Sequence, residues 1–136
     1  MVTRLGSTPI FVSDQDRALE FYRDKLGFEV VYDVPIGGDR RWIAVARKKG
    51  ETELILFHPE SYSGNAERSE DLHKRVGIWT GIIFLTDDIQ ADYKMLCERG
   101  VEFDSEPQKQ PWGGWEAFFC DPDGNRFHLA QRPAGM

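Results

Sequence analysis

The chain has 136 residues, a formal net charge of −6 and a hydrophobic fraction of 40%. This length suffices for one compact domain or two smaller repeats, and it excludes two large independent domains. The acidic balance disfavours nucleic acid and anionic membranes as partners, because both attract a basic face. No apolar run is long enough to cross a bilayer, so no membrane span is expected.

The cysteines and the N-terminus bear on the cellular compartment. Residues 1–6 lack the apolar segment of a signal peptide. Cys97 and Cys120 are far apart and form no CxxC motif. We therefore expect a cytoplasmic protein with two reduced, mostly buried and unreactive thiols, and no structural disulfide.

The first half of the chain predicts a strand, a helix and three further strands. Ser13 or Asp14 can cap the helix at its start, and Gly27 can end it. Apolar residues recur at helical spacing between these caps, whereas the flanking segments are β-branched or alternate. The expected ranges are 8–13 for the first strand, 16–26 for the helix, and 28–34, 41–47 and 53–58 for the other strands.

A polar segment at 59–76 reads as a linker, and a similar pattern follows it. Asp87 and Asp88 can cap a second helix, which Gly100 can end. The expected ranges are 81–86 for a strand, 89–99 for the helix, and 101–104, 115–120 and 126–131 for three more strands.

The two halves match in register. One such match could arise by chance, and three in register make a duplicated β-α-β-β-β module the best explanation. Phe11–Asp14 lies 74 positions before Leu85–Asp88, Leu26–Glu29 lies 73 before Arg99–Glu102, and Leu54–Leu56 lies 73 before Phe127–Leu129.

Several motifs resemble the vicinal oxygen chelate superfamily, the glyoxalase/bleomycin-resistance/dioxygenase group. They are Val12-Ser13-Asp14 with Arg17–Tyr22 and Leu26-Gly27-Phe28, then Thr86–Ile89, Arg99-Gly100-Val101 and, most specifically, Phe119–Asn125 with its Asp-Pro-Asp-Gly-Asn turn. The resemblance implies an α+β fold of two tandem βαβββ modules around a cavity, with each helix on the outer face. The modules would be about 7–58 and 79–131, joined by the linker 59–76. It also implies a homodimer, since modules pair between chains in many members.

The resemblance further implies four positions for metal ligands on the first and last strands of the modules. They hold Ser7, Ile55, Gly81 and His128. A catalytic metal normally needs three protein ligands, and only His128 is a good donor. Glu53 shares a strand face with Ile55 and could supply a second ligand if the register slips. We therefore expect no metal cofactor.

The three histidines have different expected roles. His58, at a strand end, is expected at the surface, and His73 is expected in a solvated loop. His128 alternates with Phe127 and Leu129. It is therefore either a donor or acceptor in a pocket or a hydrogen-bonded histidine inside the barrel.

Residues that alternate with the apolar core set should face the cavity. They are mainly apolar with a few polar groups, as in most small-molecule pockets, although they could also simply fill the half-barrel. Trp112 lies in a glycine-rich turn and either edges the pocket or covers the sheet edge. The candidate ligand-binding residues are Ser7, Phe11, Trp42, Ile55, Phe57, Gly81, Ile83, Trp112 and His128.

The sequence favours a metal-free, small-molecule-binding protein. It resembles in type the drug-sequestering resistance proteins, family members that bind aromatic or cationic antibiotics between two modules. The alternative is a metal-dependent lyase or dioxygenase with one divalent ion, held by His128, Glu53 and His58. A third hypothesis is an interaction or structural module without a ligand.

Overall fold

The computed structural model describes residues 1–61 and 66–136, and the side chains of all of these except residues 66 and 67. The chain forms two compact units, Met1–Gly77 (unit 1) and Ile78–Met136 (unit 2). Residues 62–65 of the expected linker lie outside the described residues. No helix in the described parts has the length and apolar character needed to pass through a bilayer.

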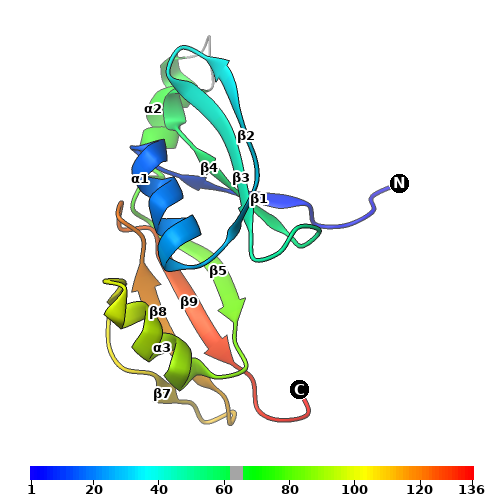
Figure 1. Cartoon of the computed structure of the whole chain (residues 1–136), viewed down its shortest axis with the longest axis vertical. Helices are drawn as coiled ribbons and strands as arrows, with labels where there is room; N and C mark the ends of the chain where they lie inside the picture. The colour runs from blue at the N-terminus through cyan, green and yellow to red at the C-terminus, as the bar shows by residue number, and fades with distance from the viewer. Residues whose placement is uncertain (62–65) are drawn as a thin grey trace. The chain divides into compact units, whose positions relative to one another are not determined.

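Unit 1 is a four-stranded sheet with a helix on one face (Figure 1). The strand order is β1-β4-β3-β2, with β1 parallel to β4 and the other pairs antiparallel. The strands are β1 (Ser7–Phe11), β2 (Glu29–Gly37), β3 (Arg40–Ala46) and β4 (Glu53–Phe57), and the helix α1 (Gln15–Glu20) continues into a π-helical turn, η1 (Phe21–Lys25).

The ends of this helix follow from two residues that the sequence singled out. The side chain of Asp14 accepts a hydrogen bond of 3.0 Å from the backbone N–H of Arg17, which confirms it as the N-cap. Gly27 follows the π turn with φ of 78°, a conformation that favours glycine. The apolar side of the helix packs on the sheet with a core that includes Ile10, Val12, Ala18, Tyr22 and Leu56, all at most 2% exposed.

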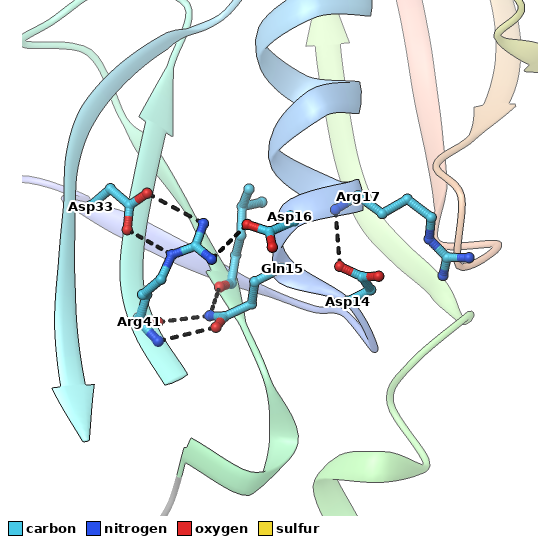
Figure 2. Close-up of polar contacts among 7 residues, drawn as sticks. Asp14, Gln15, Asp16, Arg17, Asp33 and Arg41 are labelled. Carbon is cyan, nitrogen blue, oxygen red and sulfur yellow. Dashed lines mark hydrogen bonds and ion pairs between the residues drawn. The ribbon is translucent and has the colours of Figure 1, made fainter. Parts of the chain in front are cut away.

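A buried glutamine joins α1 to two strands (Figure 2). Gln15 is 6% exposed, and its Nε2 donates to the backbone carbonyls of Arg41 and Leu56 at 2.7 and 2.9 Å. Its Oε1 accepts from the backbone N–H of Arg41 at 3.1 Å. The Arg41 guanidinium in turn pairs with Asp16 at 2.6 Å and Asp33 at 3.0 Å. These contacts fix the helix on the face of the unit 1 sheet opposite the candidate residues Trp42, Ile55 and Phe57.

Unit 2 repeats this plan with one additional short strand. The strand order is β5-β9-β8-β6, and β7 also pairs with β8. Asp88 caps α3 by accepting from the Ala91 N–H at 3.1 Å, and Gly100 follows the helix with φ of 84°. The elements are β5 (Trp79–Leu85), α3 (Ile89–Glu98), β6 (Glu102–Phe103), β7 (Gln108–Lys109), β8 (Trp115–Cys120) and β9 (Arg126–Gln131).

The turn between β8 and β9 is closed by Asp121. Asp121 is only 5% exposed. Its carboxylate accepts hydrogen bonds of 2.8–2.9 Å from the backbone N–H groups of Asp123 and Asn125 and from the side chain of Asn125. Asp121 is therefore explained by turn structure, as the sequence indicated.

Three local expectations were wrong or incomplete. The segment expected as a polar linker contains a 3-10 turn, η2 (Pro59–Ser61), and a helix, α2 (Ala66–His73). The strand β7 was not expected. Cys97 is exposed on α3 instead of buried, because its position falls past the edge of the apolar stripe that contains Ile89 and Leu96.

Candidate ligand-binding faces

Unit 2 has one covered and one open sheet face. Side chains alternate along its strands, so Phe119, Phe127 and Leu129 point toward the α3 side and are at most 5% exposed. On the other face, Trp79, Ile83 and Leu85 of β5 remain 48%, 55% and 54% exposed, respectively. We call this second side the open face of unit 2, made of Trp79, Ile83, Leu85, Glu116, Phe118, Arg126 and His128.

Aromatic rings form the floor of the open face. The His128 imidazole stacks on Phe118 with ring centroids 4.7 Å apart and planes tilted by 21°. Trp79 contacts the same phenyl ring at 5.8 Å, and the Arg126 guanidinium carbon lies 5.1 Å from its centroid. Asp104 pairs with Arg126. Phe118 thus lies at the centre of an aromatic surface with polar groups beside it.

The polar centre of this face is the pair His128 and Glu116. Nε2 of His128 lies 2.8 Å from Oε2 of Glu116, and the two side chains are 16% and 23% exposed. Nε2 is nevertheless buried without an aligned hydrogen bond to any described residue. The close approach is therefore an ionic contact when the imidazole is protonated, and its geometry is not that of a satisfied hydrogen bond.

The corresponding face of unit 1 is aromatic but covered. Phe57 contacts Trp42 edge-on at 5.3 Å and Phe11 at 5.7 Å. Ile55 and Phe57 are only 4% and 6% exposed, because Leu72 of α2 packs against them together with Ala44. We call this the covered face of unit 1, made of Phe11, Trp42, Ala44, Ile55 and Phe57.

Three other candidate residues lie in different surroundings. Ser7 is exposed and pairs with Glu53 across β1 and β4. Gly81 has φ of 73° and open space where a side chain would lie. Trp112 lies in the turn before β8, where its ring occupies the space beside Gly114 that a side chain would need. The role of these three residues in ligand binding stays a prediction.

The family's metal positions do not fit a metal in this chain. Ile55 and Gly81 carry no donor atom, and Ser7 is a weak one. Pro9 pairs with Ile55 in β4, so the register expected from the repeat holds there. Among the described residues, no group of three His, Cys, Asp or Glu side chains is placed to hold an ion.

His58 does not lie at the surface, contrary to expectation. It is 7% exposed, and its Nδ1 accepts from the Glu60 N–H at 3.1 Å. His73 of α2 contacts the His58 ring edge-on at 6.0 Å and lies 3.7 Å from the Glu60 carboxylate. The hydrogen bond from Arg40, together with the charges of His58, Arg40 and His73, lowers the pKa of Glu60. This burial arises because η2 and α2 fold back over the end of β4.

Six residues of these faces were not among the sequence candidates: Trp79, Leu85, Glu116, Phe118 and Arg126 on the open face and Ala44 on the covered face. Leu72, which packs on the covered face, was not a candidate either. Alternation along 115–120 places Glu116 and Phe118 on one face, but only the pairing of Phe118 with His128 shows which face that is. Leu72 was hidden in a segment that looked like a polar loop. The available signal was a leucine among polar neighbours, which favours a packed residue over a solvated loop.

Comparisons with known proteins cover nearly the whole chain. The model of the Glyoxalase/Bleomycin resistance protein/Dioxygenase superfamily matches residues 4–129. The Bacillus subtilis (strain 168) protein YetH is 32% identical over 131 residues, which cover 96% of this chain and all of YetH. YurT from the same strain is 39% identical over 127 residues, or 92% of this chain and 96% of YurT. Both are described as uncharacterized proteins.

Solved structures give the same result. A superfamily member from Sphaerobacter thermophilus DSM 20745 has a TM-score of 0.83 and 39% identity, covering 96% of this chain and 98% of its own. TnmS3, an antibiotic binding protein from Streptomyces sp. CB03234, has a TM-score of 0.78 and 35% identity, covering 96% and 97%. These matches confirm the α+β fold of two βαβββ modules, and the chain belongs to the Glyoxalase/Bleomycin resistance protein/Dioxygenase superfamily.

Proposed function

We propose that the chain binds a planar aromatic small molecule on the open face of unit 2, without a catalytic metal. The observation that carries this proposal is the row of rings formed by Trp79, Phe118 and His128 beside the carboxylate of Glu116. A flat ring system can stack on such a surface while the polar pair fixes its orientation. Most small-molecule sites combine apolar walls with a few polar groups in this way.

The expected binding energy has two main sources. Each well-placed aromatic contact contributes about 0.5–1.5 kcal/mol beyond the burial of its area. Covering the exposed parts of Trp79, Ile83 and Leu85 adds hydrophobic stabilisation of about 25 cal/mol per Å² of apolar surface removed from water. The polar pair contributes mainly specificity, since a ligand that covers these groups without a matching polar atom incurs a desolvation cost.

The relatives support a role in sequestering a drug. TnmS3, 35% identical over nearly all of this chain, is an antibiotic binding protein. A binding protein of this kind needs no reacting group, which suits a face whose donors do not fit a metal. We therefore expect the ligand to be an antibiotic or a similar flat aromatic compound, bound in the cytoplasm, where the free thiols Cys97 and Cys120 stay reduced.

We further propose that the chain is a homodimer. Besides the surface that the ligand would cover, Val34 and Ile36 of the edge strand β2 are 46% and 45% exposed, and a second copy would remove them from water. Light scattering on the purified protein tests this. A mass near twice the 15.6 kDa of the chain is expected, and a mass equal to that of one chain would refute the dimer.

The binding proposal is tested by thermal unfolding with two planar dyes of opposite charge, proflavine and anthraquinone-2-sulfonate. A dye present at 100 times its Kd should stabilise the protein by about 2.7 kcal/mol. The rise in Tm should be smaller in Trp79→Ala, because this variant lacks the exposed indole of the stacking surface. Met95→Ala is the control, since Met95 is exposed on α3, on the other side of the sheet.

Two results would refute the proposed function. One is that neither dye raises Tm at millimolar concentration. The other is that Trp79→Ala and Met95→Ala respond to the dyes as the unchanged protein does. A shift with only one of the dyes supports binding and also gives the charge of the ligand.

A further inference from the structure

Unit 2 has a cavity of about 500 Å³ at the carboxyl ends of β5 and β9. Residues 85–87 and 131–136 line it. The two strands are parallel, with Leu85 opposite Ala130, and Figure 1 shows both arrowheads at the end of the sheet from which the C-terminal tail continues. Crevices at this end of parallel strands bind ligands in many α/β proteins, and the volume is typical of small-molecule sites.

Two side chains of opposite charge line this cavity, one after each strand. Asp87 lies two residues beyond the end of β5, and Arg132 is the first residue beyond β9. Both are exposed. Within residues 1–61 and 66–136, neither side chain has a hydrogen bond or an ion pair, and the two do not pair with each other. The cavity thus contains a carboxylate and a guanidinium that the described chain does not neutralise.

Asp87 is not needed to begin the helix α3. The carboxylate of Asp88 accepts from the Ala91 N–H at 3.1 Å, and the Ile89 N–H donates to Oε1 of Gln131 at 2.8 Å. These two donors of the first helical turn therefore have acceptors within the chain. Capping explains Asp88 and leaves Asp87 without a structural role among the described contacts.

The first module shows that its fold does not require this charge pair. Ser13 lies 74 positions before Asp87, and Pro59 lies 73 positions before Arg132, the offsets of the repeat. Neither Ser13 nor Pro59 is charged, and Pro59 begins the 3-10 turn η2 where the chain leaves β4. The two charges are therefore a feature of the second module alone.

Apolar groups border the charged pair. Leu85 and Met136 line the cavity and are 54% and 72% exposed. The Met136 N–H donates to the Pro133 carbonyl at 3.2 Å, so the tail turns beside the strand ends. A ligand that meets both charges can therefore also cover apolar surface, which favours a ligand with an apolar group of its own.

We propose that this cavity binds a free α-amino acid with an apolar side chain, its ammonium group at Asp87 and its carboxylate at Arg132. A zwitterion neutralises both groups at once, whereas a simple cation or anion leaves one of them unpaired. The planar guanidinium suits a carboxylate in particular, because it can donate two parallel hydrogen bonds. This site is separate from the proposed function, since its ligand differs and only Leu85 borders both surfaces.

The test is an NMR titration of the ¹⁵N-labelled protein with L-leucine, N-acetyl-L-leucine and L-leucinamide. L-Leucine should shift the backbone signals of Thr86, Asp87 and Arg132 and saturate in the millimolar range. N-acetyl-L-leucine lacks the ammonium group and L-leucinamide lacks the carboxylate, so each should bind about fivefold more weakly. Absence of a saturable shift with L-leucine, or equal affinity for L-leucine and either derivative, would overturn the inference.

Charge-removing variants assign each end of the ligand. Asp87→Asn should weaken L-leucine binding about fivefold and abolish the preference for L-leucine over N-acetyl-L-leucine. Arg132→Gln should do the same for the preference over L-leucinamide. The matched controls are Glu98→Gln and Lys94→Gln, which remove the same charges from exposed positions of α3 outside the cavity. If each cavity variant binds L-leucine as its control does, the inference is wrong.

Discussion

His128 occupies in the second module the place that Ile55 holds in the first. Pro9 pairs in parallel with Ile55, and Ile83, 74 positions further on, pairs in parallel with His128. One module therefore presents an apolar face that accepts its own Leu72, whereas the other presents a polar nitrogen at the same point. The difference between Ile55 and His128 at equivalent positions thus distinguishes a covered hydrophobic surface from an open, partly polar one.

The residues at the metal-ligand positions of the family lead to a prediction about metal content. With Ser7, Ile55 and Gly81 at the other family positions, fewer donors are present than the three that a catalytic metal requires. After dialysis against a chelator and then buffer, elemental analysis should find well under one equivalent of zinc, nickel, manganese or iron per chain. A stoichiometric ion retained through this treatment would favour the lyase or dioxygenase alternative.

Gln15→Ala should lower the free energy of unfolding by about 2–3 kcal/mol. The change leaves the carbonyls of Arg41 and Leu56 and the Arg41 N–H without their partner in a buried place. Urea denaturation measures the effect as a lower midpoint. Gln90→Ala, at an exposed position of α3, is the control and should change stability by less than about 0.5 kcal/mol. Equal effects at the two positions would show that the buried glutamine is not a structural link.

Glu60 should make the stability of unit 1 depend on pH in the acid range. Its pKa is lowered in the folded chain, mainly by the hydrogen bond from Arg40. The ionised form therefore stabilises the fold above the ordinary glutamate pKa, and this contribution is lost as the pH falls through the lowered value. Glu60→Gln should be less stable than the unchanged protein at pH 7, and the gap should close toward pH 3. A gap that is constant with pH would contradict this assignment.

The two thiols should react at different rates with Ellman's reagent. Cys97 is exposed on α3, whereas burial, with the charges of Asp121 and Glu102 second, raises the pKa of the Cys120 thiol. Because the thiolate is the reacting form, one thiol per chain should react in a fast phase and the other slowly. Cys97→Ser should remove the fast phase and Cys120→Ser should keep it. The reverse pattern would be evidence against the described burial.

Much of the fold could be predicted because its local signals agree with its tertiary structure. Asp14 and Asp88 are N-caps as predicted, and Gly27 and Gly100 follow their helices with positive φ. The repeat offset also placed Ile55 and His128 correctly, since strand pairing preserves the period of two. These features depend on short stretches of chain that a single sequence displays.

The candidate site was harder to predict, because it depends on which strands are neighbours. Phe118 and Glu116 join His128 only through the pairing of β8 with β9, which periodicity does not reveal. Burial of His58 and Leu72 depends on α2 folding back on the sheet. That helix has little apolar character of its own, so tertiary contacts, and not local propensity, decide its position.

The most direct test of the central claim is an NMR titration of the ¹⁵N-labelled protein with proflavine and anthraquinone-2-sulfonate. Binding on the open face predicts that the indole N–H signal of Trp79 and the backbone signals of Phe118 and His128 move and saturate together, while those of α3 stay in place. Absence of any saturable shift, or shifts confined to α3, would contradict ligand binding on the open face of unit 2.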